Sequence, residues 1–166
     1  MRILGMILAL FLLPAPAAAQ VVLSFYSHEL GSSFPHAFVA LKGKTEDGRE
    51  VDTNYGFTAK ALTPAILMGS VAGVVEISKP SYVASSDRQF SVRLDDRQYH
   101  DVLTVVERWR TRPGKSYNLN KSNCIHFVGD IAQSVGLKVV FDKALIKKPR
   151  SFLLSILSLN PGLRGQ

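Results

Sequence analysis

The stretch Ser122-Asn-Cys-Ile-His-Phe-Val-Gly-Asp-Ile-Ala-Gln-Ser-Val135 decides how the rest of the sequence is interpreted. Its apolar residues recur at helical spacing and Gly136 stands where a left-handed cap belongs, so we expect a helix over about 124–135. Cys124 is the single cysteine of the chain and falls in the first turn, on the apolar side of this helix. The positive end of the helix dipole lowers the pKa of a thiol at such a position. The stretch therefore indicates a candidate nucleophile.

The composition limits the classes of protein to which the chain can belong. Its 166 residues suit one domain, and 46% hydrophobic with 20% charged residues exclude a disordered chain. One cysteine excludes a disulfide framework and a cysteine-based zinc cluster. Gly69-Ser-Val-Ala-Gly73 lacks the central serine of a serine-hydrolase elbow, and His28-Glu29 lacks the second histidine of a zincin motif. We expect neither a metal nor another cofactor.

The first nineteen residues have the pattern of a secretory signal peptide. Arg2 precedes an apolar run over 3–13, Pro14 ends the run, and Ala17-Ala18-Ala19 places small residues at a cleavage site. The run is shorter than the about 20 residues that cross a bilayer. We therefore expect residues 1–19 to be a signal peptide, residues 20–166 to be the mature domain, and the protein to be periplasmic or secreted. The alternative is an uncleaved N-terminal anchor.

Upstream of residue 124 the sequence predicts a β-hairpin, further strands and one long helix. Asp95 with Gln98 makes a variant of the capping box. Apolar residues from Tyr99 to Trp109 follow at helical spacing until Pro113-Gly114. Strands are expected at 21–26, 36–42, 49–55, 71–77 and 90–94, and further helices at 64–68 and 150–159. Because no repeat or linker divides the chain, the sequence predicts a single α+β domain.

A nucleophilic thiol needs an imidazole base within hydrogen-bonding reach, and the chain has four histidines. His126 lies two residues beyond Cys124 on the same helix and so points about 200° away. His100 lies among polar residues of the long helix, and His28 falls in a loop of unknown position. His36 begins an otherwise apolar strand and is the candidate base, the alternative being a core histidine with satisfied hydrogen bonds.

A third residue would orient the imidazole from the neighbouring strand of the hairpin. The predicted register places residues 54 and 55 across from His36. Asn54 is the first choice for this role and Asp52 the second, because both lie on the polar face of that strand. The sequence thus leaves the third residue open between these two side chains.

Two motifs together resemble a known superfamily. Ser122-Asn-Cys-Ile-His-Phe-Val128, with His36-Ala-Phe-Val39 far upstream, resembles the circularly permuted papain-like (NlpC-type) proteins, in which the histidine strand precedes the cysteine helix. The cysteine motif is similar to that of the lecithin:retinol acyltransferase branch. The segments Tyr55-Gly-Phe57 and Tyr117-Asn-Leu119 are similar to its bacterial secreted members. The resemblance covers about residues 21–140, most of the expected mature chain.

The resemblance implies a permuted papain-like fold, in which an antiparallel sheet packs against the helix that carries the cysteine at its N-terminus. It implies Cys124 as nucleophile, His36 as general base and a polar residue of the next strand as the orienting group. The reaction would be acyl transfer through an acyl-thioenzyme, with backbone N–H groups at the helix start stabilising the oxyanion.

Three functions fit this site. The first is an exported thiol hydrolase, an amidase or peptidase acting on cell-wall peptides. The second is a lipid acyltransferase or thioesterase that uses the same pair of side chains. The third is a non-catalytic binding domain that keeps the fold. A peptide or an acyl lipid would be the substrate, and the sequence does not indicate an oligomeric state.

The C-terminal part of the chain is basic. Anionic cell wall or lipid headgroups are the expected partners of this part, and nucleic acid is not expected for an exported protein; ordinary solvation is the alternative. The apolar helix at 150–159 is expected to cover the core, and membrane-surface docking is the alternative. This part contains one acidic residue, Asp142, and six basic residues: Lys138, Lys143, Lys147, Lys148, Arg150 and Arg164.

Overall fold

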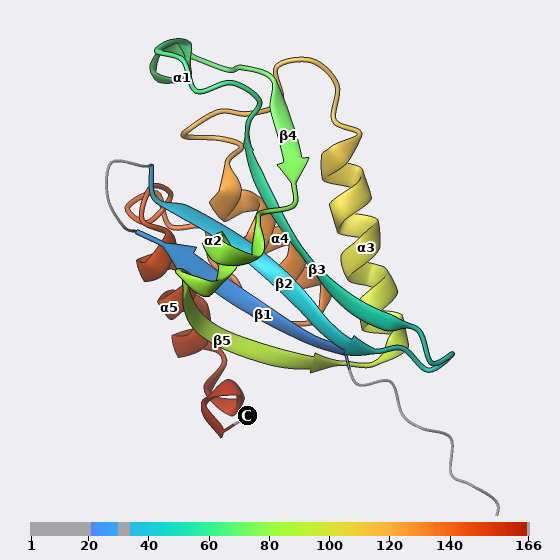
Figure 1. The fold of residues 1–166 in the computed structure, drawn as a ribbon. Coiled ribbons are helices and arrows are strands. Elements are labelled where there is room, and N and C mark those ends of the chain that lie inside the picture. Colours follow the sequence, from blue (N-terminus) through green and yellow to red (C-terminus); the bar gives the residue numbers. More distant parts are fainter. Residues whose placement is uncertain (1–20, 30–33, 166) are drawn as a thin grey trace, which may run out of the picture.

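A computed structural model describes residues 21–29 and 34–165, so the expected signal peptide lies outside the described residues. The chain forms one five-stranded sheet in the order β4-β3-β2-β1-β5, and every neighbouring pair of strands is antiparallel (Figure 1). The predicted α+β class is confirmed. The strands are β1 (Val21–His28), β2 (His36–Lys44), β3 (Glu50–Ala59), β4 (Gly73–Glu76) and β5 (Asp87–Leu94).

Helices cover the two faces of the sheet unequally. The three long ones lie behind the sheet in Figure 1, whereas the short α2 crosses its front and the short α1 stands at the top. The helices are α1 (Ala65–Met68), α2 (Pro80–Ala84), α3 (Asp96–Arg110), α4 (Cys124–Ser134) and α5 (Pro149–Leu159), followed by a 3-10 turn at Pro161–Gly165. We call the two sides of the sheet the helix-covered face and the α2 face.

The ends of the long helices are where the sequence places them. Asp95 caps α3 and forms a capping box with Gln98, because each side chain bonds to the other residue's backbone N–H. Gly136 follows α4 with φ at 87°, the left-handed conformation that glycine adopts without strain. Both predicted helix boundaries are confirmed to within one residue.

Successive side chains along each strand point to opposite faces of the sheet. Ala37, Val39 and Leu41 of β2 are fully buried in the main core, together with side chains of α3, α4 and α5. Phe38, the residue between them, lies on the α2 face, where its ring stacks on Tyr26. The expectation that the C-terminal apolar helix covers the core is confirmed, since α5 has three fully buried side chains: Phe152, Leu153 and Ile156.

The turn between β2 and β3 sets the register of the hairpin. Gly48, with φ at 84°, and the hydroxyl of Thr45, which accepts from the Arg49 N–H at 3.1 Å, centre the turn on residues 46–48. The predicted turn lay about two residues earlier in the chain. Asn54 therefore pairs with Ala40, and the predicted register, which placed residues 54 and 55 across from His36, is wrong.

Candidate active site

Asn123 fixes the start of the cysteine helix. It is almost fully buried, and its side-chain oxygen accepts from the Ile125 N–H at 2.9 Å, which caps α4. Its side-chain amide donates to the carbonyls of Leu119 at 2.8 Å and Ile146 at 2.9 Å. One side chain thus joins the helix start to two loops, and Cys124 is held as the first residue of the helix.

His126 completes this cap. Its ring nitrogen Nδ1 accepts from the backbone N–H of Asn123 at 3.3 Å, as the third residue of a capping box does. The helical spacing had already excluded His126 as the base for Cys124, and the structure gives it a role in the cap that the sequence analysis did not assign.

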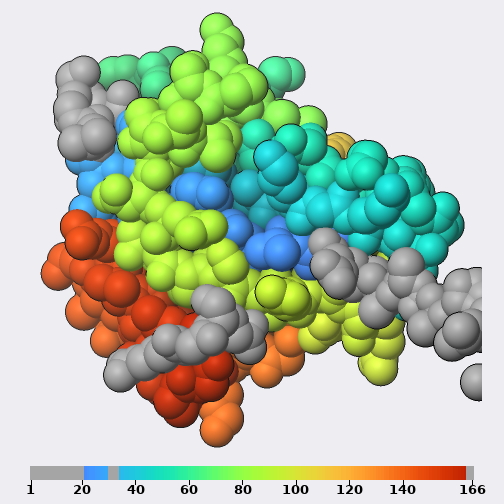
Figure 2. All heavy atoms as spheres, turned by 60° about the horizontal axis from the view of Figure 1, so that its bottom comes forward, coloured from blue at the N-terminus to red at the C-terminus, as the bar shows by residue number. Residues whose placement is uncertain are grey.

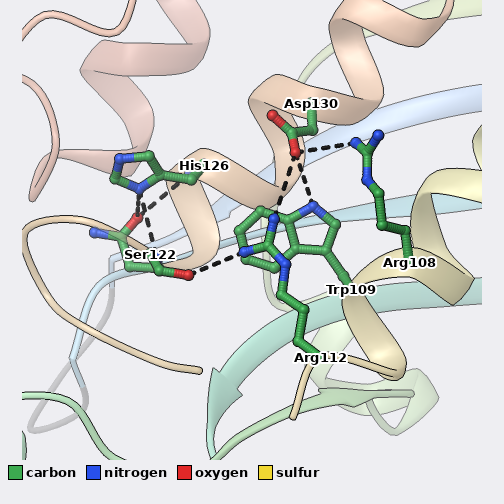
Figure 3. A network of polar contacts seen from close by, with 7 residues as sticks. Arg108, Trp109, Arg112, Ser122, His126 and Asp130 are labelled. Carbon is green, nitrogen blue, oxygen red and sulfur yellow. Dashed lines mark hydrogen bonds and ion pairs between the residues drawn. The ribbon is translucent and has the colours of Figure 1, made fainter. Parts of the chain in front are cut away.

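A polar network fixes the loop that precedes Cys124 (Figure 3). Asp130 accepts from the Trp109 indole at 2.9 Å and from Arg108 at 3.2 Å. The Arg112 guanidinium lies 3.3 Å from the centroid of the Trp109 ring and donates to the Ser122 hydroxyl at 3.1 Å. The network ties α3, α4 and the intervening loop together, so the backbone before the thiol has a fixed course.

The thiol of Cys124 is buried at the end of β2. Its side chain is 6% exposed, and burial raises its pKa to about 11, although hydrogen bonds from the backbone amides of Ala37, Ile125 and Cys124 itself act to lower it. The expectation of a lowered thiol pKa is therefore wrong for this conformation, because burial outweighs the helix start. The effect of the Ala37 amide and the packing of α4 on β2 place the start of α4 near Ala37, the residue that follows His36.

His36 lies on the α2 face, above Gly56 of β3. A Cβ atom built on Gly56 would be 2.6 Å from His36 Nε2, so the glycine leaves the space that the imidazole occupies. Nε2 is buried and has no hydrogen-bond partner among the described residues. Burial lowers the pKa of His36 to about 4, and the charge of His28 acts in the same direction. The imidazole is therefore neutral near pH 7 and can accept a proton.

The structure brings Cys124 and His36 to the same end of the sheet, from opposite faces of β2. The ladder between β2 and β3 begins at the pair Phe38–Gly56, and Ala37, whose amide acts to lower the pKa of the thiol, is the residue just before Phe38. The imidazole approaches the same point from the α2 face. Because Nε2 is unpartnered, no Nε2–sulfur hydrogen bond is formed in this conformation of the described chain.

Neither candidate for the orienting residue touches His36. The side-chain amide of Asn54 donates to the Ser78 carbonyl at 3.0 Å, and its oxygen accepts from the Ser78 N–H at 2.7 Å. Asp52 pairs with Lys42 at 3.5 Å on the surface. Asn54 instead ties the segment before α2 to the sheet, and the shifted turn of the hairpin is the physical reason for both placements.

His28 and Tyr82 are the residues near His36 that the sequence analysis did not assign. His28 pairs with His36 across β1 and β2, and its ring stacks on Tyr82 with centroids 4.3 Å apart. Burial raises the pKa of Tyr82 to about 12, and the charges of Glu76 and Cys124 act in the same direction. Its phenol therefore stays protonated. The sequence did contain a signal for the proximity of His28 and His36, because β1 ends with one histidine and β2 begins with the other.

A cavity of about 790 Å³ opens at this end of the sheet. His36, His28, Tyr82 and Glu76 contribute polar groups to it, and Glu76 is the one acidic residue among the described lining residues. Five large apolar side chains line one part of the cavity: Phe34, Leu62, Ile66, Ile77 and Leu119. Further polar residues also belong to its lining: Thr58, Ser78, Lys79, Ser81, Ser85 and Tyr117. The arrangement offers a neutral base, a phenolic donor and an apolar wall within one hollow.

A second hollow lies beside α2. Figure 2 views the molecule from the lower end of Figure 1 and shows blue atoms of the sheet between the green α2–β5 segment and the teal atoms of β3. Tyr26, Asn54 and Arg88 are among its lining residues. The α2 face is thus only partly covered.

Comparison with protein-family models, with curated proteins and with solved structures gave no match. Within residues 21–29 and 34–165, no three His, Cys, Asp or Glu side chains are grouped so that they could hold a metal ion. The described helices include none that is long and apolar enough to cross a membrane.

Proposed function

We propose that the chain is an exported cysteine hydrolase with a permuted papain-like fold, in which Cys124 is the nucleophile and His36 the general base. The observation that carries the proposal is that α4 packs on β2 near its His36 end, where the backbone amide of Ala37, the residue next to His36, acts to lower the pKa of the Cys124 thiol. A cysteine at a helix start and a histidine at the start of an adjacent strand are the two parts of such a site.

The resting site holds a neutral thiol and a neutral imidazole. Burial keeps both groups uncharged, because it raises the pKa of Cys124 to about 11 and lowers that of His36 to about 4. His36 Nε2 is unpartnered in the described chain, so rotation of the ring toward the sulfur breaks no hydrogen bond at that atom. We infer that substrate entry into the cavity accompanies this rotation.

The reaction then proceeds in two steps. His36 takes the thiol proton while the sulfur forms a bond to the substrate carbonyl carbon, and the imidazolium gives the proton to the departing amine or alcohol. Water next attacks the acyl-thioester, with His36 again as base, which releases the acid and restores the thiol. Tyr82 is the side chain best placed to donate to the oxyanion, because its phenol lines the cavity and stays protonated.

An amide or peptide of the cell wall is the first candidate substrate for an exported enzyme of this kind. An acyl lipid is the second, and one observation favours it. Five large apolar residues line the cavity, whereas Glu76 is its one acidic residue among those described. An acyl chain is the substrate group that an apolar wall of this extent suits.

The decisive experiment is to trap the acyl-enzyme. Purified protein is incubated with p-nitrophenyl esters of short and long acyl chains and with muropeptides, and intact mass spectrometry measures the adduct on Cys124. We expect turnover to be lost in Cys124→Ala and to fall about 10²–10⁴-fold in His36→Ala. His100→Ala, an exposed histidine of α3, is the matched control and should leave turnover unchanged.

Alkylation of the thiol gives a second measurement that needs no substrate. The rate of iodoacetamide labelling should rise about tenfold per pH unit up to pH 9 without a plateau, as a thiol with a raised pKa requires. Full turnover of every substrate by Cys124→Ala would refute the proposal. The absence of any adduct or turnover, with labelling unchanged in His36→Ala, would favour the binding domain.

A further inference from the structure

Large apolar side chains are exposed around α1, at the top of the molecule in Figure 1. Met68 is 90% exposed, Leu62 72% and Leu67 71%. Ile66, which lies between them in the sequence, is buried and lines the cavity, so it anchors this segment to the body of the protein. We call Leu62, Leu67 and Met68 the apolar tip.

The exposed apolar surface continues onto the rim of the cavity. Phe34 and Ile77 are more than half exposed and line the same cavity as Leu62 and Ile66. Five of the eight exposed large hydrophobic residues in the described chain therefore lie at this end. Single exposed apolar side chains are ordinary on a protein surface, but a contiguous group next to a cavity marks an interaction site.

Three lysines lie in the segment that carries the apolar tip and in the loop that pairs with this segment. Backbone and side-chain hydrogen bonds join Lys60 to Ala72, Val71 to Tyr117 and Ser70 to Asn118, so residues 60–72 lie against the loop before α4. Lys60, Lys115 and Lys121 are exposed in these two segments, and none of them forms an ion pair within the described ranges. Residues 57–75 and 111–123 contain no Asp or Glu.

We propose that the apolar tip docks on the surface of an anionic lipid bilayer. The three apolar side chains would enter the boundary between headgroups and acyl chains, and Lys60, Lys115 and Lys121 would lie against the anionic headgroups. Exposed apolar side chains with basic side chains in the same and in the neighbouring segment suit an anionic bilayer surface, whose charge the lysines complement. The three side chains of the tip are exposed and the segments 57–75 and 111–123 carry no acidic residue, which favours an anionic lipid surface over a basic peptide or helix.

Docking in this way has a consequence for the cavity. Leu62 belongs both to the apolar tip and to the cavity wall, and Phe34 and Ile77 line the rim. The cavity therefore adjoins the bilayer when the tip is inserted. This inference concerns binding alone and does not depend on the chemistry proposed for Cys124.

The test is vesicle co-sedimentation of the protein recovered after export, with its N-terminus determined by intact mass. One vesicle contains phosphatidylcholine with 30 mol% phosphatidylglycerol, roughly the anionic content at which basic surfaces bind, and the other phosphatidylcholine alone. We expect binding to the anionic vesicle that weakens as salt is raised. The variant Leu67→Ser/Met68→Ser should lose about tenfold in affinity, because partitioning follows the apolar area inserted.

Two further variants complete the test. Leu154→Ser/Leu159→Ser removes two exposed leucines from α5 and should bind like the wild type. Lys60→Glu/Lys115→Glu/Lys121→Glu should lose both binding and its dependence on salt. Unchanged iodoacetamide labelling of Cys124 in every variant shows that the fold is kept, and it separates failure of docking from failure of the proposed chemistry.

Three outcomes would overturn the proposal: no binding to anionic vesicles, equal binding of the tip variant and the wild type, or equal loss in the α5 control. Sedimentation velocity tests whether a second copy of the chain, rather than a bilayer, occupies the patch. A dimer of the wild type that the tip variant abolishes would identify the patch as a contact between two copies of the chain and would also overturn the proposal.

Discussion

The two faces of the sheet differ in how they are covered and in what they contain. The helix-covered face packs Phe57, Trp109 and Phe127 against one another, with ring centroids of Phe57 and Phe127 each within 6 Å of the Trp109 ring. The α2 face instead gathers histidine and tyrosine rings under a helix of five residues. One face supplies stability and the other leaves polar groups accessible from a cavity.

Neighbouring residues of one strand belong to these two environments. Ala37 packs in the main core, whereas His36 lies over Gly56 on the α2 face. Cys124 begins α4 on the helix-covered face, and the backbone amide of Ala37 acts to lower the pKa of its thiol. The candidate site is therefore at the place where the two environments meet, and substitutions on either side should have different consequences.

The largest effect is expected in the core. Phe127 is fully buried on α4 and contacts both Trp109 and Phe57. Phe127→Ala should lower the free energy of unfolding by about 3–5 kcal/mol, because it removes apolar area and leaves a cavity. Urea unfolding followed by tryptophan fluorescence measures the change. A loss below about 1 kcal/mol would mean that the helix-covered face is not the main source of stability.

A pH-dependent effect should come from the α2 face. Burial lowers the pKa of His36 from 6.5 to about 4, so between these values the unfolded chain binds a proton that the folded chain does not. The stability contributed by the neutral imidazole is fully present above pH 6.5 and is lost as the pH falls to 4. The loss should amount to about 3 kcal/mol.

Urea unfolding at pH 7, 6, 5 and 4 compares the wild type with His36→Asn. We expect the stability of the wild type to fall more steeply with acid than that of the variant, since only the wild type has this buried base. Parallel curves for the two proteins would show that His36 keeps its ordinary pKa in the folded state.

A smaller effect is expected at the glycine beneath the imidazole. Gly56→Ala places a methyl group 2.6 Å from His36 Nε2 and 3.3 Å from the Cβ of Phe38. The ring must move, which should cost about 1–3 kcal/mol of stability and alter turnover through His36. Gly162→Ala, where no atom lies within 4 Å of the new methyl group, is the matched control. Equal stability of both variants would refute the placement of His36.

The last comparison is between two nearby polar residues of β3, and the smallest effect is expected at Asp52. Asn54→Ala leaves the Ser78 amide without its acceptor and should cost about 1–3 kcal/mol. Asp52→Ala removes a pair in which both side chains are 79% exposed and should cost less than about 0.5 kcal/mol. Thermal unfolding compares the two variants. A reversed order would mean that α2 is not tied to the sheet through Asn54.

Local sequence signals predicted the parts of the fold that depend on neighbouring residues. The capping box of Asp95, the glycine after α4 and the apolar spacing of α5 all act within one or two helical turns. The antiparallel hairpin was predicted, but its register depended on the position of a turn, which Thr45 and Gly48 determine. A two-residue displacement of that turn moved Asn54 away from His36.

The candidate site depended on information that the sequence does not carry locally. The helix start around Cys124 favours a thiolate, but the raised pKa comes from burial, which arises only when distant segments pack. The pairing of His28 with His36 required the register of β1 against β2. The sequence analysis assigned no helix between the strands expected at 71–77 and 90–94, where the five-residue α2 lies. The signal peptide, the papain-like topology and the chemistry of Cys124 stay predictions.

α2 has no buried residue within the described chain, in contrast to the seven of α4. Detachment of α2 would return less apolar area to water than detachment of α4, so this segment should open by local unfolding more often than the long helices. Amide hydrogen exchange would register that opening as fast exchange at residues 80–84. The imidazole beneath it would then meet solvent from time to time, without any loss of order in the helices on the other face.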